Sequence, residues 1–286
     1  MDGVKWIAIG LVGLILVYGC LTALGARLWQ RATRNLVAAL NAGRQDGRGT
    51  HYNAAEIAGL PAPVRGYFER ALTHGQPIIR FVQINQAGSF NLSLVAPQWK
   101  PFTARQHVIT ARPGFVWDAA ILMFPAVPVR VVDAYIAAVG LLRPAILGLF
   151  PMGAVQGTGE IARGELIRYF AEAVWYPTAL LPSQGVVWQA VDDSSARATI
   201  SDGPHSLTLL FRFGAEGLVA EVHADARGGM MGKTMVMMPW DCRLSQYRRQ
   251  DGMLVPVTAE VIWQTPQGER PYYRGRITRL AYKFAQ

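Results

Sequence analysis

The residues with the clearest capacity for acid–base chemistry are two carboxylates in apolar surroundings. Glu172 follows Arg168 by four positions in a segment with helical spacing, so the two side chains are expected one turn apart on one face. Asp133 stands inside the apolar run VVDAY and is predicted to be buried. A buried carboxylate with a raised pKa can act as a general acid or base. A structural ion pair explains the same residues, and we favour it because neither acid has a second catalytic group at a recognisable spacing.

The sequence contains no recognisable motif for a cofactor, a metal or an activated nucleophile. Gly157, Gly159 and Gly164 have the spacing G-x-G-x-x-x-x-G without a surrounding βαβ pattern, which argues against a dinucleotide site. His223 and Asp225 would share one strand face and could supply two metal ligands, but a solvated polar face is the simpler interpretation. We therefore predict no cofactor and no metal. Whether the chain is an enzyme stays open, and the lack of a catalytic motif favours a non-enzyme.

Aromatic and sulfur-containing side chains are the candidates for contact with an apolar ligand. The segment from Met230 to Trp240 holds five of the nine methionines, and methionine suits core filling, an adaptable pocket lip or soft-metal binding. The tryptophans lie in or beside apolar segments, where they are core residues more often than binding platforms. The candidate ligand-binding residues are Trp117, Asp133, Tyr135, Arg168, Glu172, Trp175, Trp188, Met235, Met237 and Trp240.

An N-terminal membrane anchor is the clearest structural element of the sequence. The segment from Trp6 to Ala26 has no charged side chain, and as a helix it would be about 30 Å long, the thickness of the bilayer hydrocarbon. An uncleaved membrane helix is the favoured interpretation. A cleaved secretory signal and a lipoprotein signal ending at Cys20 are the alternatives, and the apolar run is longer than either requires.

The basic residues that follow the anchor bear on its orientation. Arg27, Arg31 and Arg34 would lie on one face of a helix that continues to about Asn41, close to anionic head groups. Counted with Arg44 against Lys5, they favour a cytoplasmic domain. The glycines and charges of residues 42–50 are typical of a linker. The predicted organisation is an anchor and juxtamembrane helix at 1–41, a linker at 42–50 and one β-rich globular domain at 51–286.

The pattern of the globular domain predicts an antiparallel sheet. Apolar and polar residues alternate in segments such as 207–213, 218–225 and 280–284, and turn signals separate them. About ten strands are expected between Ile78 and Phe284, interrupted once at 139–181 by apolar sequence that includes a helix at 160–176. The predicted fold class is α+β: an N-terminal transmembrane helix followed by a large curved antiparallel sheet, a half-barrel, wrapped around one or two apolar helices.

The charge of the chain does not indicate a nucleic-acid partner. The net charge is +9, but the basic residues stand singly along presumed strands instead of clustering with aromatic residues on one element. We therefore predict no nucleic-acid binding. Cys20 and Cys242 cannot form a disulfide within the domain, so cysteine usage does not identify the redox compartment.

Several aromatic motifs resemble a bacterial family of unknown function. They are Phe115-x-Trp117, the run RYFAE at 168–172 with Trp175 and Pro177, then Trp188 and Tyr272-Tyr273-x-Gly275. The resemblance covers the chain from about Leu60 to Phe284 and implies an N-terminal membrane segment, with no activity assigned. In architecture, the expected sheet is similar to the half-barrel of periplasmic lipoprotein carriers. That likeness points to the periplasm, whereas the arginine count points to the cytoplasm, so the side of the membrane stays open.

The functional hypothesis that follows is a membrane-tethered protein that binds a lipid or another apolar ligand on the concave face of the sheet. One alternative is an enzyme that uses Glu172 or Asp133 in the same cavity. The other is a scaffold or assembly module of a membrane complex. The expected partners are the lipid bilayer and an apolar small molecule or lipid, and the sequence leaves the oligomeric state undetermined.

Overall fold

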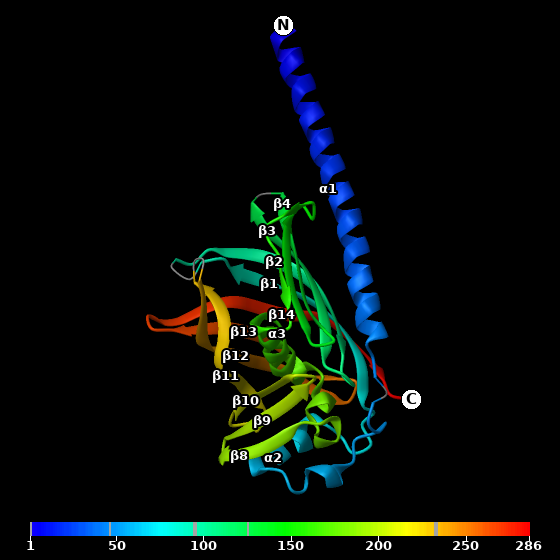
Figure 1. Cartoon of the computed structure of the whole chain (residues 1–286), viewed down its shortest axis with the longest axis vertical. Coiled ribbons are helices and arrows are strands. Elements are labelled where there is room, and N and C mark those ends of the chain that lie inside the picture. The colour runs from blue at the N-terminus through cyan, green and yellow to red at the C-terminus, as the bar shows by residue number, and fades with distance from the viewer. Residues whose placement is uncertain (1, 46, 94–95, 125, 232–233) are drawn as a thin grey trace.

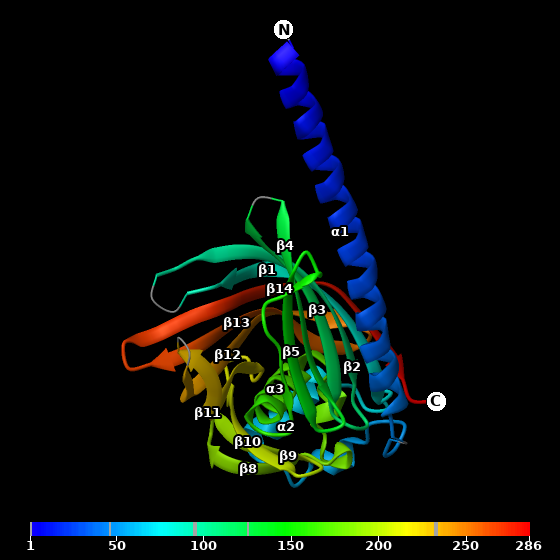
Figure 2. The ribbon, with the colours of Figure 1, turned by 45° about the horizontal axis from the view of Figure 1, so that its top comes forward.

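The computed structural model describes residues 2–45, 47–93, 96–124, 126–231 and 234–286. A long N-terminal helix stands beside one large antiparallel sheet, which curves around short helices (Figures 1 and 2). The predicted fold class, an apolar N-terminal helix followed by a curved antiparallel sheet holding helices, is confirmed.

The helices and strands have the following bounds. The α-helices are α1 (Asp2–Ala42), α2 (Ala62–Ala71) and α3 (Glu160–Ala171), and the 3₁₀-helices are η1 (Ala54–Ile57), η2 (Glu172–Trp175), η3 (Pro177–Leu180) and η4 (Pro182–Gln184). The strands are β1 (Ile79–Asn91), β2 (Trp99–Ile109), β3 (Gly114–Phe124), β4 (Val127–Ile136), β5 (Val139–Ile146), β6 (Phe150–Pro151), β7 (Val155–Gly157), β8 (Val187–Asp192), β9 (Ser195–Asp202), β10 (His205–Phe213), β11 (Val219–Met231), β12 (Thr234–Gln250), β13 (Met253–Thr265) and β14 (Gly268–Phe284).

The strands form one open antiparallel sheet in which most neighbours are also neighbours in sequence. The order is β6-β5-β4-β3-β2-β1-β14-β13-β12-β11-β10-β9-β8, and β7 pairs with β5. Among the described residues the sheet has fourteen strands, more than the ten that the alternation predicts. The predicted interruption at 139–181 is wrong in its first part, because residues 139–146 form β5.

The missed strand β5 is covered on both faces, which removes the alternation that marks a one-sided strand. On its inner face α3 approaches so closely that a Cβ atom at Gly140 would lie 2.6 Å from the backbone nitrogen of Ala162. On its outer face Leu141 and Ala145 belong to the apolar cluster beneath α1. A strand that makes contacts on both faces has the apolar composition of a core helix, so sequence periodicity cannot distinguish the two.

The concave face of the sheet contains the main hydrophobic core. In Figure 2, α3 lies inside the curve of the sheet, and α2 lies near β9. The core joins α2, α3 and the 3₁₀-helices to the inner side chains of the strands, with fully buried Tyr67, Phe68, Phe170 and Phe211. The predicted helix 160–176 is α-helical only to Ala171, and η2 then leads to Pro177, which disfavours the α conformation just before it.

Helix α1 has two halves with different surroundings. From Gly3 to Gly19 every described residue is exposed, and the helix is long and apolar enough to cross a membrane. Its C-terminal half lies on the outer, convex face of the sheet, where Trp29 and Leu40 are buried with side chains of β2 to β5. The sheet is therefore attached directly to the helix, as well as through the chain that follows it.

Candidate functional site

The predicted pair Arg168 and Glu172 lies inside the curve of the sheet, together with Asp133. The Arg168 guanidinium is 2.8 Å from a Glu172 oxygen through Nε and 2.6 Å from an Asp133 oxygen through Nη1. The second Glu172 oxygen accepts a hydrogen bond of 2.6 Å from Gln106 Nε2. Trp117 lies against the guanidinium, 4.8 Å from ring centre to Cζ. Both carboxylates are buried and held by strong partners, which is the arrangement of a structural ion pair.

A second arginine and a third carboxylate extend this group. Arg227, from β11, lies between Trp240 and Trp263 and donates a hydrogen bond of 3.1 Å to the Tyr272 hydroxyl. Its Nη2 is 3.8 Å from an oxygen of Glu165, from α3. We call Asp133, Glu165, Arg168, Glu172 and Arg227 the inner charge cluster.

The charges of the inner charge cluster balance if one of its acids keeps a proton. Burial raises the pKa of Glu165 well above its ordinary value, and the adjacent Asp133 carboxylate raises it further by charge and by a hydrogen bond. One oxygen of Asp133 and one of Glu165 have no other hydrogen-bond partner in the described ranges of the chain. A proton shared between these two carboxyl groups satisfies both and leaves two negative charges for the two arginines.

Three other predicted ligand-binding residues are core side chains. Tyr135 is fully buried and donates a hydrogen bond of 2.9 Å to Asp202. Trp188 donates one of 3.0 Å to the Leu180 carbonyl oxygen. Trp175 is 3 % exposed and belongs to the main core. The hydrogen bonds of Tyr135 and Trp188 go to groups outside the inner charge cluster, and Trp175 lies in η2 together with Glu172.

The remaining candidates lie near the end of β11 and the beginning of β12. Trp240 is buried against Arg227 and donates a hydrogen bond of 3.0 Å to the Tyr272 hydroxyl. Met235 and Met237 are exposed, and a Cβ atom at Gly228 would contact both of their sulfur atoms. Residues 232 and 233 of the methionine-rich segment lie outside the described residues.

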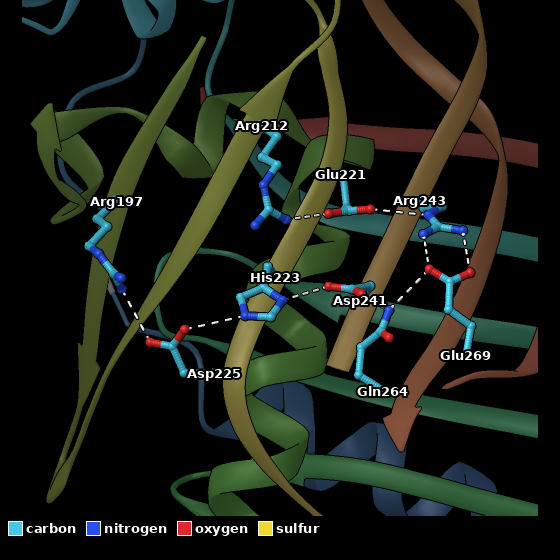
Figure 3. Close-up of polar contacts among 9 residues, drawn as sticks. All are labelled: Arg197, Arg212, Glu221, His223, Asp225, Asp241, Arg243, Gln264 and Glu269. Carbon is cyan, nitrogen blue, oxygen red and sulfur yellow. Dashed lines mark hydrogen bonds and ion pairs between the residues drawn. The ribbon is translucent and has the colours of Figure 1, made fainter. Parts of the chain in front are cut away.

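The predicted neighbours His223 and Asp225 belong to a polar ladder on the outer face of β9 to β14 (Figure 3). His223 Nδ1 lies 2.6 Å from Asp241, and this contact raises the histidine pKa. Arg243 joins Glu221 to Glu269 in the same ladder. Within the described part of the chain no three His, Cys, Asp or Glu side chains are arranged to hold a metal ion. The ladder pairs these polar side chains with one another on the outer face of the sheet, where Asp225 is exposed and Asp241 is buried.

The outer groove is a cavity of about 900 Å³ between α1 and the convex face of the sheet. Alternate residues of β1 to β4 point outward there, because the intervening ones fill the core. Helix α1 supplies the second wall. The principal polar side chains of the groove are Gln30, Thr33 and Arg34 from α1, Asn85, Thr103, Arg105 and His107 from β1 and β2, and Asp118 and Arg130 from β3 and β4.

The outer groove has an excess of positive charge. Among the described residues, none of Arg34, Arg105 and Arg130 makes a salt bridge, although each carries a full charge. Asp118 is the acid of the groove, and one of its oxygens accepts a hydrogen bond of 2.8 Å from Trp29 Nε1. Burial raises the Asp118 pKa, while Trp29, Arg130 and Arg105 oppose that rise.

Two polar atoms on the strand side of the groove have no hydrogen-bond partner among the residues that the structure describes. They are Oδ1 of Asn85 and Nδ1 of His107, and both atoms are buried. Burial lowers the His107 pKa, and the charge of Arg105 lowers it further, so the ring is neutral at pH 7. Buried polar groups usually have partners, so these atoms together with the arginines offer hydrogen-bonding capacity to a polar ligand.

Sequence patterns gave only one signal for this groove, the basic face of Arg27, Arg31 and Arg34. Arg105, His107 and Arg130 occupy outward strand positions, where polar residues are ordinary. Their convergence depends on the pairing of Arg105 with Asp118 and of Arg130 with Ala120 across β2, β3 and β4. Pairing partners far apart in sequence cannot be read from local periodicity.

Comparison with known proteins gives one family and two distant structures. Residues 58–282 match a family of unknown function, DUF6920. A search of curated proteins gives no match. A LolA superfamily protein from Nitrosomonas europaea aligns with 80 % of this chain and 96 % of its own length, at 10 % identity and a TM-score of 0.40. A beta-barrel-like protein of a domain of unknown function (DUF1849) from Brucella abortus aligns with 72 % and 99 %, at 10 % identity and a TM-score of 0.23.

Proposed function

Because the chain belongs to the DUF6920 family, whose function is unknown, we propose a function from the chain's own geometry. The protein is a membrane-anchored binding protein that holds the anionic phosphate head group of a membrane lipid in the outer groove. The observation that carries this proposal is the convergence of Arg34, Arg105 and Arg130 on one cavity without a salt bridge to any carboxylate of the described residues. Arginine is well suited to phosphate because its planar guanidinium donates two parallel hydrogen bonds.

The position of the outer groove along α1 supports a lipid as the source of the anion. Gln30 and Arg34 follow the uncharged segment that ends at Ala26 by four and eight residues. At 1.5 Å per residue they lie about 6 and 12 Å beyond it along the helix axis. Head groups occupy the several Å outside the hydrocarbon, so the near end of the groove is within reach of a lipid phosphate.

The concave face of the sheet is less suited to a ligand than the outer groove. It is occupied by α3, the 3₁₀-helices and α2, whose side chains form the main core. The carboxylates that an enzyme would use there, Glu172 and Asp133, are both bound to Arg168. We therefore propose that the protein is membrane-tethered and binds a lipid, and that the lipid head group lies on the convex face of the sheet instead of the concave face.

The test is lipid binding by the full-length chain in a mild neutral detergent. Bound phosphatidylglycerol is counted by native mass spectrometry, and the Arg105→Gln/Arg130→Gln double variant is compared with the parent. Each charge-assisted hydrogen bond contributes about 1.5–3 kcal/mol, so we expect affinity to fall by at least about tenfold. Arg248→Gln/Arg249→Gln is the matched control, since it removes the same charge from exposed positions in the last residues of β12, away from the outer groove.

Three outcomes would contradict the proposal. One is an equal loss of affinity in both double variants, which would show general attraction between a basic protein and an anionic lipid. Another is equal binding of phosphatidylcholine and phosphatidylglycerol by the parent, because the arginines would then not distinguish the anionic lipid. The third is displacement of the lipid by inorganic phosphate at the lipid's own concentration, which would identify the ligand as a soluble anion.

A further inference from the structure

Two connections between strands lie directly against the uncharged segment of α1. The Tyr18 hydroxyl donates a hydrogen bond to the carbonyl oxygen of Ala126, between β3 and β4. A Cβ atom at Gly25 would overlap the carbonyl oxygen of Leu147, after β5, and would lie 2.9 Å from Cγ of Leu149. Figure 1 shows β3 and β4 rising beside α1 toward its N-terminal end.

Both connections are apolar and expose large side chains. No charged residue occurs between Asp118 and Arg130, or between Arg143 and Glu160. We call the described residues 119–124 and 126–129 together with 146–153 the apolar tips. Four large apolar side chains of the tips are exposed, and they are Leu122 (46 %), Phe124 (63 %), Phe150 (53 %) and Met152 (48 %).

Three of the connections at the opposite ends of the strands contain or adjoin charged residues, whereas the β4–β5 turn, Ala137-Ala138, is uncharged. The turn between β2 and β3 contains Arg112, and the turn between β10 and β11 contains Glu216. The turn between β12 and β13 contains Asp251, with Arg249 just before it. The strand ends beside the apolar half of α1 thus expose apolar side chains, whereas these three turns at the opposite ends are charged. Such a difference between the two ends is expected of a surface that meets a membrane.

We propose that the apolar tips enter the same lipid bilayer that α1 crosses. Tyr18 precedes Ala26 by eight residues, so Ala126 lies about 12 Å along the helix axis into the uncharged segment. Interfacial protein segments enter the boundary between head groups and acyl chains by about 5–10 Å, a comparable depth. The bilayer is the occupant that fits, because α1 carries the tips to this depth in whichever orientation it crosses.

The contact between Tyr18 and Ala126 also suits a site with little water. A hydroxyl on the membrane segment and a carbonyl oxygen in a turn each cost free energy in hydrocarbon if they lack a partner. Here each satisfies the other. The domain is thereby held on the bilayer at α1 and at both tips. This inference does not rest on the ligand of the outer groove, because it concerns apolar side chains alone.

The test measures the depth of a spin label on the full-length chain in vesicles of phosphatidylcholine. Phe124→Cys is made in a Cys20→Ser background, and Cys242 is retained because it is buried. Electron paramagnetic resonance then compares broadening by oxygen, which concentrates in acyl chains, with broadening by a water-soluble nickel chelate. Ala215→Cys, in the exposed turn between β10 and β11, is the matched control. Leu122→Cys provides a second site in the first tip.

We expect the labels at 122 and 124 to be accessible to oxygen and protected from nickel, and the label at 215 to show the reverse. The inference is overturned if the tip labels are as accessible to nickel as the label at 215. It is also overturned if they are shielded from both reagents, since a protein would then cover the tips. Circular dichroism checks that each labelled chain is folded. The Arg105→Gln/Arg130→Gln variant should give the same depth, which separates this inference from lipid binding in the groove.

Discussion

Two groups of arginines lie on opposite faces of the same sheet, and they differ in how their charges are matched. On the concave face, Arg168 and Arg227 lie against tryptophan rings and face carboxylates. On the convex face, the guanidinium groups of Arg34, Arg105 and Arg130 make no salt bridge to any described carboxylate. In the first group Arg227 is buried and the Arg168 side chain is only 14 % exposed, whereas Arg34 and Arg105 of the second group are exposed.

The difference shows how charge balance can separate a structural cluster from a binding site. A buried arginine must have a partner, because removal of its solvation shell costs several kcal/mol. An arginine at a half-open groove can keep its water until an anion displaces it. The charges of the inner charge cluster are therefore matched without a ligand, whereas the outer groove has an excess of positive charge that an anionic ligand can neutralise.

The largest effect is expected from Arg168→Met. This substitution keeps much of the side-chain volume but leaves Asp133 and Glu172 buried without their counter-charge. Removing one member of a buried ion pair costs about 3–5 kcal/mol, so the free energy of unfolding should fall by about that amount. Urea denaturation of the full-length chain in detergent, followed by tryptophan fluorescence, measures it.

The control for Arg168→Met is Arg105→Met, the same substitution in the outer groove. Arg105 is exposed and makes no salt bridge within the described part of the chain, so its replacement should change the free energy of unfolding by no more than about 0.5 kcal/mol. Equal losses in the two variants would mean that burial and pairing do not distinguish the two groups, and the comparison would fail.

The next prediction concerns pH and uses Glu165→Gln. In the folded chain the raised pKa keeps Glu165 protonated above the pH at which the unfolded chain releases that proton. The stabilisation from this proton is complete below the unfolded pKa and is lost as the pH rises through the folded pKa. Glutamine cannot ionise and imitates the protonated acid. Denaturation curves between pH 5 and 9 should therefore show the variant gaining stability relative to the parent as the pH rises.

The opposite result would change the description of the inner charge cluster. If the parent loses no stability relative to Glu165→Gln across this range, then Glu165 is ionised in the folded chain and the cluster carries an extra negative charge. Asp133→Asn offers a separate check. It removes a charge bound to Arg168 instead of the proton between the two acids, so it should destabilise the chain at every pH in the range.

The sequence was sufficient for the main elements of the fold where one physical rule dominated. The uncharged segment from Trp6 to Ala26 identified the apolar helix, and alternation identified strands such as 207–213. Strand β5 was missed because α3 and α1 cover both of its faces. The contact between the apolar tips and α1 was missed as well, because apolar composition does not show which other element a turn will meet.

The same limit applies to the charged groups. The spacing of Arg168 and Glu172 predicted their contact, and the apolar context of Asp133 predicted its burial. Arg227 and Gln106 come from β11 and β2 and reach the cluster only through the order of the strands. The outer groove depends still more on this order, because it needs three neighbouring strands and α1 to place ordinary surface arginines around one cavity.

The smallest effect is expected from Asp118→Asn, which increases the excess of positive charge in the outer groove. Trp29 can still donate its hydrogen bond to the asparagine oxygen, so the fold should be retained. The substitution removes a negative charge that attracts Arg105 and Arg130 and repels an incoming phosphate. A charge about 4 Å away contributes about 1 kcal/mol in water, which corresponds to roughly fivefold tighter binding of phosphatidylglycerol. The native mass spectrometry titration measures this change. Weaker binding would show that the Asp118 carboxylate contributes to lipid binding. The arginines of the outer groove would then depend on a carboxylate, as those of the inner charge cluster do.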